Sequence, residues 1–387
     1  MVSRGAYARL LAPPGTSFFL FGVRGVGKST WAREHFARAR RFDLLDDTLY
    51  QDLLANPGMF ADALRPVPRG DWIVVDEVQR VPALLNEVHR AMEEQRLRFA
   101  LLGSSACKLK TGGTNLLAGR AIWKQLYPLL PEELATDFDL ERVLRYGSVP
   151  LIWMAEDPGA TLQAYVQLYL REEIRAEAVV RNLPGFVRFL PVAALFHGQT
   201  LNVAAIARDA ATARTTVNGY IEILEDTLVA FRLPAYEARL RVRERKLPKF
   251  YWVDPGLVRA VKKSTGKVLP EERGPLFEGW VLGLLRAYAE YRGLFEEISY
   301  WAPLQARGLE VDFLLRRGKE FLAIEAKSSA RFGRSQLEGL KAIGDLNGVV
   351  RRVLVYAGSQ ELRTQEGIDV WPVPVFLSKL RTGKLWP

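Results

Sequence analysis

A glycine-rich segment near the N-terminus has the residue types that cradle phosphate groups. The run Gly-Val-Arg-Gly-Val-Gly-Lys-Ser spans residues 22–29. Glycines let backbone N–H groups approach phosphate oxygens, the lysine can reach the β- and γ-phosphates, and the serine hydroxyl can ligate Mg²⁺. The sequence therefore predicts a site for ATP and Mg²⁺ formed by Gly22, Val23, Arg24, Gly25, Val26, Gly27, Lys28, Ser29 and Thr30.

Two acids follow a later apolar run, as a hydrolytic site requires. Trp-Ile-Val-Val at 72–75 reads as a buried strand, and Asp76 and Glu77 come directly after it. Asp76 is expected to hold Mg²⁺ through water, and Glu77 to polarise the attacking water. Ser104 follows a third apolar run and is expected to contact the γ-phosphate. The pairing with the glycine-rich loop predicts ATP hydrolysis rather than binding alone.

Arg120 has two interpretations. In the run Leu-Ala-Gly-Arg at 117–120 it could complete the catalytic site of a neighbouring subunit as an arginine finger, or it could be an ordinary surface arginine. The first interpretation implies a homo-oligomer, with a ring as one form.

Acidic residues and a lysine near the C-terminus form a candidate metal site. A hairpin that turns at Arg317-Gly318 would place Glu325 diagonally across from Asp312, with Lys327 on the same face. Glu278, on a preceding helix, is a further candidate ligand. Carboxylate oxygens suit Mg²⁺, and this Asp, Glu-x-Lys pattern is typical of restriction-endonuclease-like folds. The alternative is an exposed, charged strand face.

The net charge of +10 is concentrated in one segment. Residues 239–267 hold ten basic side chains against Glu244 and Asp254, a net of +8. A phosphate backbone is a natural partner for such an excess, and a solvated surface is the alternative. The predicted DNA-binding residues are Arg214, Arg241, Arg243, Arg245 and Lys246.

The apolar patterns predict an α/β protein with several domains. Residues 1–130 alternate short strands with helices, as in a parallel sheet, and form a P-loop core. A helical lid is expected at 131–188. A winged helix-turn-helix is expected at 189–265, with helices at 203–210 and 214–225 and strands at 228–235 and 247–253. An α/β restriction-endonuclease-like domain is expected at 274–387, after a linker at 266–274.

Composition bounds the setting in which the chain works. It has 387 residues, a single cysteine, Cys107, and three scattered histidines, so neither an internal disulfide nor a histidine-rich zinc site is expected. No apolar run is long enough for a membrane helix, and the first residues do not resemble a signal peptide. We therefore expect a cytoplasmic protein with no membrane partner.

Over nearly its whole length the chain resembles a family of archaeal and bacterial AAA+-type ATPases that carry a C-terminal region of unknown function. The residues that carry the resemblance lie at 22–30, 76–79, 102–105, 117–120, 126–129, 250–257, 276–278, 310–312 and 325–327. The resemblance implies a P-loop ATPase followed by a nuclease-like fold. One departure is Arg-Tyr-Gly-Ser-Val-Pro at 145–150, where members of this family usually have a Gly-Gly pair.

These observations favour an ATPase that binds duplex or branched DNA and translocates on it or remodels it. A second hypothesis is an ATP-gated, metal-dependent DNA nuclease that uses Asp312, Glu325 and Lys327. A third is an ATPase whose nuclease-like domain serves only as a platform for binding or oligomerisation.

Overall fold

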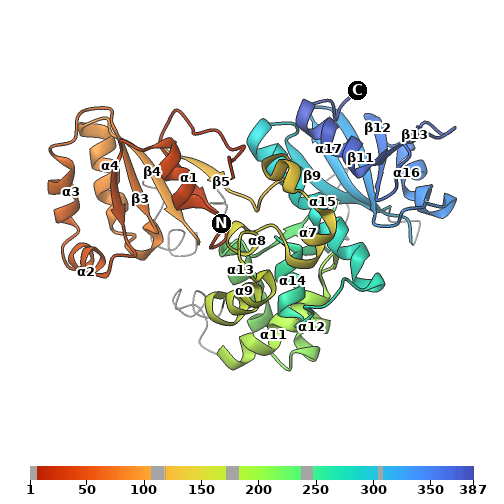
Figure 1. Cartoon of the computed structure of the whole chain (residues 1–387), viewed down its shortest axis with the longest axis horizontal. Coiled ribbons are helices and arrows are strands. Elements are labelled where there is room, and N and C mark those ends of the chain that lie inside the picture. Colours follow the sequence, from red (N-terminus) through yellow and green to blue (C-terminus); the bar gives the residue numbers. More distant parts are fainter. Residues whose placement is uncertain (1–6, 106–116, 118, 171–182, 237–246, 304–307) are drawn as a thin grey trace.

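The computed structural model of the protein describes residues 7–105, 117, 119–170, 183–236, 247–303 and 308–387. Within these residues the chain forms three sheets, which Figure 1 shows in three regions of the molecule. The N-terminal sheet lies on the left of the view, the C-terminal sheet lies on the right, and a largely helical region with a small sheet lies below and between them.

The N-terminal sheet has five parallel strands in the order β2-β3-β4-β1-β5. Its strands are β1 (Phe18–Phe21), β2 (Arg40–Asp43), β3 (Trp72–Asp76), β4 (Arg98–Gly103) and β5 (Ile122–Gln125). The connecting helices are α1 (Lys28–His35), α2 (Asp47–Ala55), α3 (Gly58–Leu64) and α4 (Leu84–Glu94). Apolar runs at 18–21, 42–45, 72–75, 99–102 and 122–127 predict five strands, and each observed strand begins and ends within two residues of these bounds.

Both faces of this sheet are buried, because alternate residues of a strand point to opposite sides. Phe18 and Leu20 of β1 pack in the same cluster as Trp31 of α1. Phe19 and Phe21 pack on the other face with residues of α2, α3 and α4. The carboxyl ends of β1, β3 and β4 therefore lie side by side at one edge, where the phosphate loop and the acids are found.

The middle region begins with short helices: α6 (Pro131–Leu134), α7 (Leu140–Tyr146), α8 (Pro150–Trp153), α9 (Pro158–Ala164) and the π-helix η4 (Tyr165–Leu170). Helix α11 (Leu183–Leu195) follows, so the domain boundary expected at 188 falls inside a helix. Helices α12 (Val203–Asp209) and α13 (Arg214–Asp226) are joined by a short turn. Strands β6 (Gln199–Thr200), β7 (Ala230–Leu233) and β8 (Lys249–Trp252) form an antiparallel sheet in the order β6-β8-β7, and α14 (Pro255–Val261) follows β8.

The C-terminal region begins with the long helix α15 (Pro270–Arg292). Residues 270–274, expected in a linker, are its first turn, because Pro270 at the first position and Glu272 in the capping position favour a helix start. The sheet has the order β13-β14-β12-β11-β10-β9. Its strands are β9 (Glu297–Trp301), β10 (Val311–Arg317), β11 (Glu320–Lys327), β12 (Val349–Tyr356), β13 (Leu362–Arg363) and β14 (Asp369–Pro372); α16 (Glu338–Ala342) and α17 (Val373–Thr382) complete the region.

The hairpin β10–β11 has a different register from the one the sequence predicts. Arg317 pairs with Glu320, so the turn is Gly318-Lys319 rather than Arg317-Gly318. Gly318 has a φ of +59°, which glycine adopts without strain. The pairing continues through Phe313 opposite Ile324, which places Asp312 directly opposite Glu325 instead of diagonal to it. A shift of two residues keeps both side chains on one face.

None of the helices that the structure describes is both long enough and apolar enough to cross a membrane.

Candidate functional site

The phosphate loop joins β1 to α1 and wraps around the amine of its own lysine. Lys28 is buried, and its Nζ donates hydrogen bonds to the carbonyl oxygens of Gly22 (2.7 Å) and Val23 (3.4 Å). Gly27 adopts a left-handed conformation (φ 94°) directly before α1 begins. The positive end of the α1 dipole therefore faces the loop, which favours a bound anion.

Two glycines of the loop are required by close neighbours. A Cβ at Gly22 would lie 2.5 Å from the carbonyl oxygen of Leu126, and a Cβ at Gly25, whose φ is +76°, would lie 2.8 Å from the Cβ of Leu151. The loop can pass between these neighbours only because both residues lack side chains.

Asp76 and Ser29 come together at the carboxyl edge of the sheet. The Ser29 hydroxyl hydrogen-bonds to Asp76, and Lys28 lies close enough to lower the pKa of this acid. Burial has the larger effect and raises the pKa of Asp76 above its ordinary value, with Glu77 and Asp43 adding to the rise. This hydroxyl and carboxylate are the pair that a nucleotide-bound Mg²⁺ uses.

Glu77 is held in place by Gln79 and Ser104. The Ser104 hydroxyl donates to Glu77 Oε2 (3.0 Å), and Gln79 Nε2 donates both to Glu77 Oε2 and to the Ser104 oxygen (3.0 Å). Glu77 itself has a left-handed backbone (φ 56°), which costs energy in a residue with a side chain. The structure thus joins the predicted base and sensor through a residue to which sequence reasoning gave no role.

Gln79 is nearly fully buried, and its Oε1 has no hydrogen-bond partner among the described residues. A Cβ at Gly103 would lie 2.7 Å from this oxygen, so the glycine at the end of β4 leaves room for it. An unpaired acceptor beside Glu77 is available to a water molecule. The sequence signal for Gln79 is its place in the run 76–79, which carries the family resemblance but assigns this residue no role.

Segments of the middle region and of the N-terminus contact the phosphate loop. The backbone N–H of Leu151, in α8, donates to the Gly25 carbonyl oxygen (3.2 Å). The Tyr165 hydroxyl, at the start of η4, donates to the Arg24 carbonyl oxygen (3.0 Å). Arg9 donates to the Val26 carbonyl oxygen (2.7 Å). The loop is therefore held from outside the parallel sheet as well as by it.

A cavity of about 120 Å³ adjoins the first turn of α1. Gly27, Thr30 and Glu34 line one side of it, and Arg9, Pro150 and Met154 line another. Through Gly27 the cavity reaches the end of the phosphate loop.

Asp254, two residues after the end of β8, connects the middle sheet to the segment before α8, the helix that contacts the phosphate loop through Leu151. Its Oδ2 accepts from the Ser148 N–H (2.7 Å), and its Oδ1 accepts from Gly256 (2.8 Å) and Leu257 (3.3 Å) in the first turn of α14. Burial raises the pKa of Asp254 to about 6, although these backbone donors and Val149 act in the opposite direction. A Cβ at Gly147 would lie 1.7 Å from Asp254 Oδ1, so the approach requires glycine.

The predicted C-terminal residues also converge. Asp312 Oδ2 accepts from the Ala326 N–H (2.9 Å), and Glu325 Oε2 accepts from the Asp312 N–H (3.3 Å). Lys327 Nζ lies 2.6 Å from Glu325 Oε1 and 3.9 Å from Asp312 Oδ2. Glu278 faces the same group from α15. The four residues that the sequence singled out are therefore neighbours.

A buried lysine from the middle region enters this group. Lys249, the first residue of β8, lies 3.1 Å from Glu278 Oε1 and 3.6 Å from Asp312 Oδ1, and it also pairs with Glu310. Tyr251 donates its hydroxyl to Glu278. The sequence shows Lys249 only as one of the ten basic residues at 239–267, since nothing local marks a lysine whose acidic partners lie 29 to 63 residues away.

The pKa values of the acids are shifted by burial and by neighbouring charges. Burial and the charge of Asp312 raise the pKa values of both Glu278 and Glu325, against the nearby ammonium groups of Lys249 and Lys327. Burial would lower the pKa of Lys249, but the charges of Glu278, Asp312 and Glu310 outweigh it and raise that pKa. The lysine thus stays protonated and shares the group with the carboxylates.

Across the ranges that the structure describes, no three His, Cys, Asp or Glu side chains are grouped so that they could hold one metal ion. The proposed metal ligands Glu278, Asp312 and Glu325 are close together, but the cations that pair with them are the ammonium groups of Lys249 and Lys327. The restriction-endonuclease-like metal site remains a prediction.

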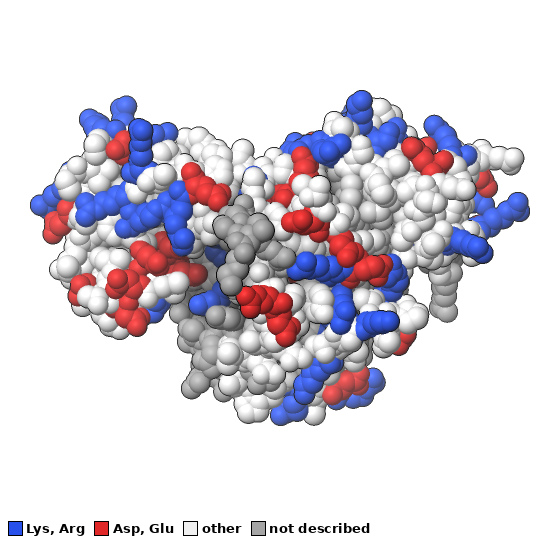
Figure 2. Space-filling model, in the orientation of Figure 1, with Lys and Arg blue, Asp and Glu red and all other residues white. Residues whose placement is uncertain are grey.

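Two members of the basic segment are not at the surface. Lys249 and Arg259 are both buried, and Arg259 bonds to Glu272 and to the carbonyl oxygens of Arg145, Gly266 and Lys267. Arg214 is exposed at the start of α13. Arg241, Arg243, Arg245 and Lys246 lie outside the described residues, as does Cys107. On the face in Figure 2, basic side chains are spread over all three regions with acidic ones between them.

Arg120 lies at the surface and pairs with Glu93 of the same chain, at 2.5 Å between Nε and Oε1. Its side chain is 43% exposed, so it is accessible to a neighbouring molecule.

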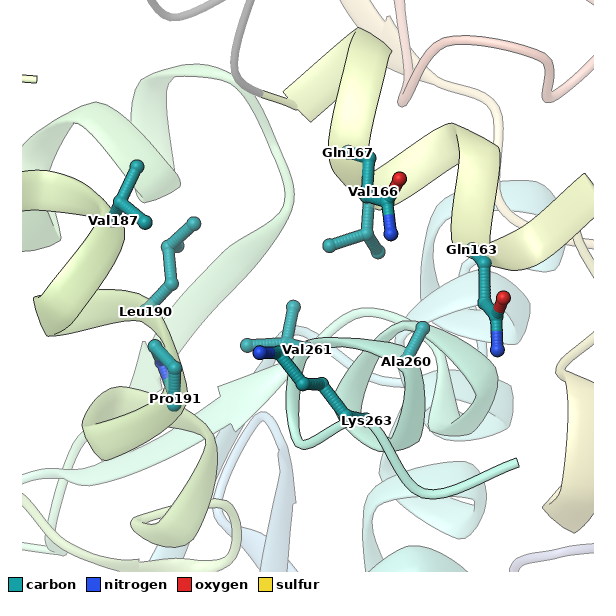
Figure 3. A pocket seen from close by; sticks show the side chains of 9 residues that line it. All are labelled: Gln163, Val166, Gln167, Val187, Leu190, Pro191, Ala260, Val261 and Lys263. Carbon is teal, nitrogen blue, oxygen red and sulfur yellow. The ribbon is translucent and has the colours of Figure 1, made fainter. Parts of the chain in front are cut away.

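A further cavity of about 550 Å³ opens in the middle region, lined by none of the predicted site residues. Figure 3 shows side chains from α9 and η4, from α11 and from the end of α14 converging on it. Val166, Val187, Leu190 and Val261 form an apolar wall, and Gln163, Gln167 and Lys263 supply polar groups.

Comparison with protein families matches three parts of the chain. Residues 15–135 match an AAA domain. Residues 137–267 match a domain of unknown function, DUF8612, and residues 273–376 match another, DUF4143. The protein therefore contains an AAA-type, P-loop ATPase domain followed by two domains of unknown function.

Two curated relatives are similar to most of the chain. The uncharacterised protein Rv2008c of Mycobacterium tuberculosis is 26% identical over 369 residues, which cover 93% of this chain and 80% of the relative. An uncharacterised protein of Haemophilus influenzae is 22% identical over 318 residues, which cover 77% and 75% of the two chains. The Walker-type ATPase PABY2304 of Pyrococcus abyssi is 16% identical and covers 63% of this chain and 90% of its own, with a TM-score of 0.43, too low to support a shared overall fold.

Proposed function

We propose that the N-terminal domain hydrolyses ATP with Mg²⁺ and that the rest of the chain applies this reaction to DNA. The observation that carries the first part is the grouping of Lys28, Ser29 and Asp76 around the phosphate loop, with Glu77 held beside them. The donor set fits the cofactor, since Ser29 and Asp76 supply hard oxygen ligands and would hold Mg²⁺, which neutralises phosphate charge when bound.

The residues of the nucleotide site have distinct roles in this proposal. Lys28 leaves the carbonyl oxygens of Gly22 and Val23 to bind the β- and γ-phosphates. Glu77 orients a water molecule towards the γ-phosphorus and accepts its proton. Gln79 and Ser104 are positioning residues that fix the carboxylate, and the Gln79 Oε1 accepts a hydrogen bond from the same water. The cavity beside Thr30 takes the nucleotide base.

Nucleotide binding and turnover test this part directly. The wild-type chain is expected to bind a fluorescent ATP analogue and to release phosphate in the presence of Mg²⁺. Lys28→Ala should abolish both activities, while Lys384→Ala, an exposed lysine far along the chain, should change neither. A wild-type chain that binds ATP but releases no phosphate, with or without DNA, would leave only a nucleotide-binding role.

The proposal for DNA rests on the middle region. Helices α12 and α13 and the pair β7–β8 follow one another in the order of a winged helix-turn-helix. Arg214 is exposed where the second helix of such a motif would enter a groove. The chain carries a net charge of +10. We propose that Arg214 and the basic run Arg241, Arg243, Arg245 and Lys246 contact phosphates of duplex or branched DNA, which hydrolysis then moves or remodels.

The burial of Lys249 and Arg259 reduces the number of basic residues that can contact DNA. Those two residues are committed to internal partners, so the proposed contacts depend on Arg214 and on residues 241–246. We expect salt-sensitive binding to duplex, forked and four-way DNA, with DNA stimulating ATP hydrolysis. Replacing Arg241, Arg243 and Arg245 together by alanine should weaken binding, and Arg331→Ala serves as an exposed control. The absence of both DNA binding and stimulation would refute this part alone.

DNA cleavage is not our preferred function for the C-terminal domain. Lys249 stands among the carboxylates that would have to hold the metal ion. This arrangement favours a role in binding or assembly, in which the nuclease-like residues are structural.

A further inference from the structure

The carboxylate group of the C-terminal domain has an ammonium at its centre. Glu278 comes from α15, Glu310 from the segment before β10, and Asp312 from β10, and Lys249 Nζ pairs with all three. The Lys249 side chain is only 5% exposed, and that of Asp312 only 6%. An ammonium has three N–H donors, so one lysine can serve three acidic partners.

The pairing explains how several acids can be buried together. Ionised carboxylates removed from water are costly unless a cation and hydrogen bonds compensate them. Lys327 compensates Glu325 and approaches Asp312 on its Oδ2 side. Lys249 lies on the Oδ1 side of Asp312 and joins it to Glu278 and Glu310. The two lysines therefore divide the acids between them, and only one of the two belongs to the C-terminal sheet.

A metal ion shared by Glu278, Glu310 and Asp312 would have to occupy the volume that the Lys249 ammonium takes. Mg²⁺ requires oxygen atoms at about 2.0–2.1 Å in near-octahedral geometry, and it is repelled by a neighbouring positive charge. We propose that Lys249 is the resident cation of this carboxylate group and that it excludes divalent metal ions while β8 remains docked on the C-terminal domain.

The docking that carries Lys249 into the group involves backbone as well as side chains. After β7, the Tyr236 N–H donates to the Tyr300 carbonyl oxygen in β9 (2.7 Å), and the Tyr300 N–H donates to the Pro234 carbonyl oxygen (2.9 Å). The Tyr300 hydroxyl donates to the Leu247 carbonyl oxygen (2.6 Å), two residues before the lysine. The segment that follows β7 and the segment that enters β8 are thus both hydrogen-bonded to β9 of the C-terminal sheet. The acids therefore form the site at which Lys249 of the middle region docks on the C-terminal domain.

Manganese binding to the full-length chain, measured without nucleotide by the loss of the free Mn²⁺ electron paramagnetic resonance signal, tests the proposal. All proteins carry Asp76→Asn, which removes a metal ligand of the nucleotide site. In this background we expect no saturable Mn²⁺ binding. Adding Lys249→Ala should create about one bound Mn²⁺ per chain, because the acids then lack their cation. Adding Asp312→Asn as well should abolish that binding, and Lys263→Ala, an exposed lysine, should create none.

Two results would overturn the proposal. One is saturable Mn²⁺ binding in the Asp76→Asn protein that disappears when Asp312→Asn is added, since the intact lysine would then tolerate a metal ion. This measurement requires no change at Lys249, so it decides even if Lys249→Ala impairs folding. The other is the absence of a new site in a folded Lys249→Met protein, in which the aliphatic part of the side chain is preserved. Neither result depends on ATP hydrolysis.

Discussion

The carboxylate of Asp254 accepts a hydrogen bond from the backbone N–H of Ser148, with 2.7 Å between oxygen and nitrogen. Asp254 lies two residues after the end of β8, and Ser148 lies two residues before α8 begins. The backbone N–H of Leu151, in α8, donates to the Gly25 carbonyl oxygen of the phosphate loop. Strand β8 therefore has Lys249 among the C-terminal acids at one end and a contact leading to the phosphate loop at the other. The C-terminal acids and the phosphate loop are therefore connected through β8 and the Asp254–Ser148 hydrogen bond.

Gly147→Ala is expected to disrupt this connection. The new Cβ would lie 1.7 Å from Asp254 Oδ1, and the φ of +77° is unfavourable for alanine. We expect a loss of about 2–4 kcal/mol in the free energy of unfolding, measured by urea denaturation, together with weaker ATP binding.

Gly274→Ala is the matched control, because a Cβ there has nothing within 4 Å and the residue lies inside α15. It should stabilise the protein by about 0.5–1 kcal/mol. Equal effects of the two substitutions would contradict the role assigned to Gly147.

Asp254→Asn should have an effect that depends on pH. The pKa of Asp254 is raised from 3.8 to about 6 by burial, so the folded protein binds a proton at this site more strongly than the unfolded chain does. The stabilisation from that proton is complete below pH 3.8 and is lost as the pH rises through about 6. The wild-type chain should therefore lose up to about 3 kcal/mol of stability over this window through this group, and the asparagine variant should not.

The unfolding free energy of the wild type minus that of Asp254→Asn should accordingly be higher at pH 4.5 than at pH 7. Denaturant unfolding at the two pH values measures it, with Asp157→Asn as a control at an exposed helix cap. A difference that is the same at both values would show that Asp254 titrates in the folded protein as it does in the unfolded chain.

The parts of the nucleotide site that were predictable from sequence are those set by local pattern. Lys28 and Ser29 follow a glycine run, and Asp76 and Glu77 end an apolar strand, so each element carries its own signal. Gln79 lies in the run 76–79 that carries the resemblance, but its role is not evident from that run, because it depends on Ser104, which is 25 residues away and directly after β4. These residues come together because β3 and β4 are neighbours in the sheet, and the order of strands cannot be predicted from the sequence of any single segment.

The C-terminal hairpin shows the same limit. The alternation of charged and apolar residues placed Asp312, Glu325 and Lys327 on one face, and a register shift of two residues left that face unchanged. The turn itself was placed one residue too early, because both Arg317-Gly318 and Gly318-Lys319 contain the glycine that a tight turn needs. Lys249 is counted among the basic residues at 239–267 that suggest a phosphate partner or a solvated surface, because a count of charges does not show which side chains are buried.

Glu77→Gln is expected to separate ATP binding from hydrolysis. The amide keeps the size of the side chain but cannot accept the proton of the attacking water, so kcat should fall about 10²–10⁴-fold while ATP binding is retained. Phosphate release and nucleotide titration measure the two quantities. Glu94→Gln, at an exposed position of α4, should change neither. Hydrolysis that survives Glu77→Gln would require another base.

Gln79→Ala should lower kcat about tenfold with little change in KM, because Gln79 positions the carboxylate rather than the nucleotide. Ser104→Ala should have an effect of similar size. The two residues hold the same Glu77 oxygen, so the double variant should be less impaired than the product of the single effects predicts. Independent, multiplicative effects would show that Gln79 and Ser104 do not act through one shared network.

Arg120 allows a test of whether the catalytic site is complete within one chain. If it acts on the γ-phosphate of a neighbouring molecule, it must leave Glu93, the partner it has within its own chain. Arg120→Ala and Lys28→Ala proteins should each be inactive alone, and mixing them should restore part of the ATPase activity, because some interfaces would join an intact phosphate loop to an intact arginine. Glu93→Gln, which frees Arg120, should not lower activity. If mixing restores no activity while Arg120→Ala alone remains fully active, the arginine belongs to an ordinary surface ion pair.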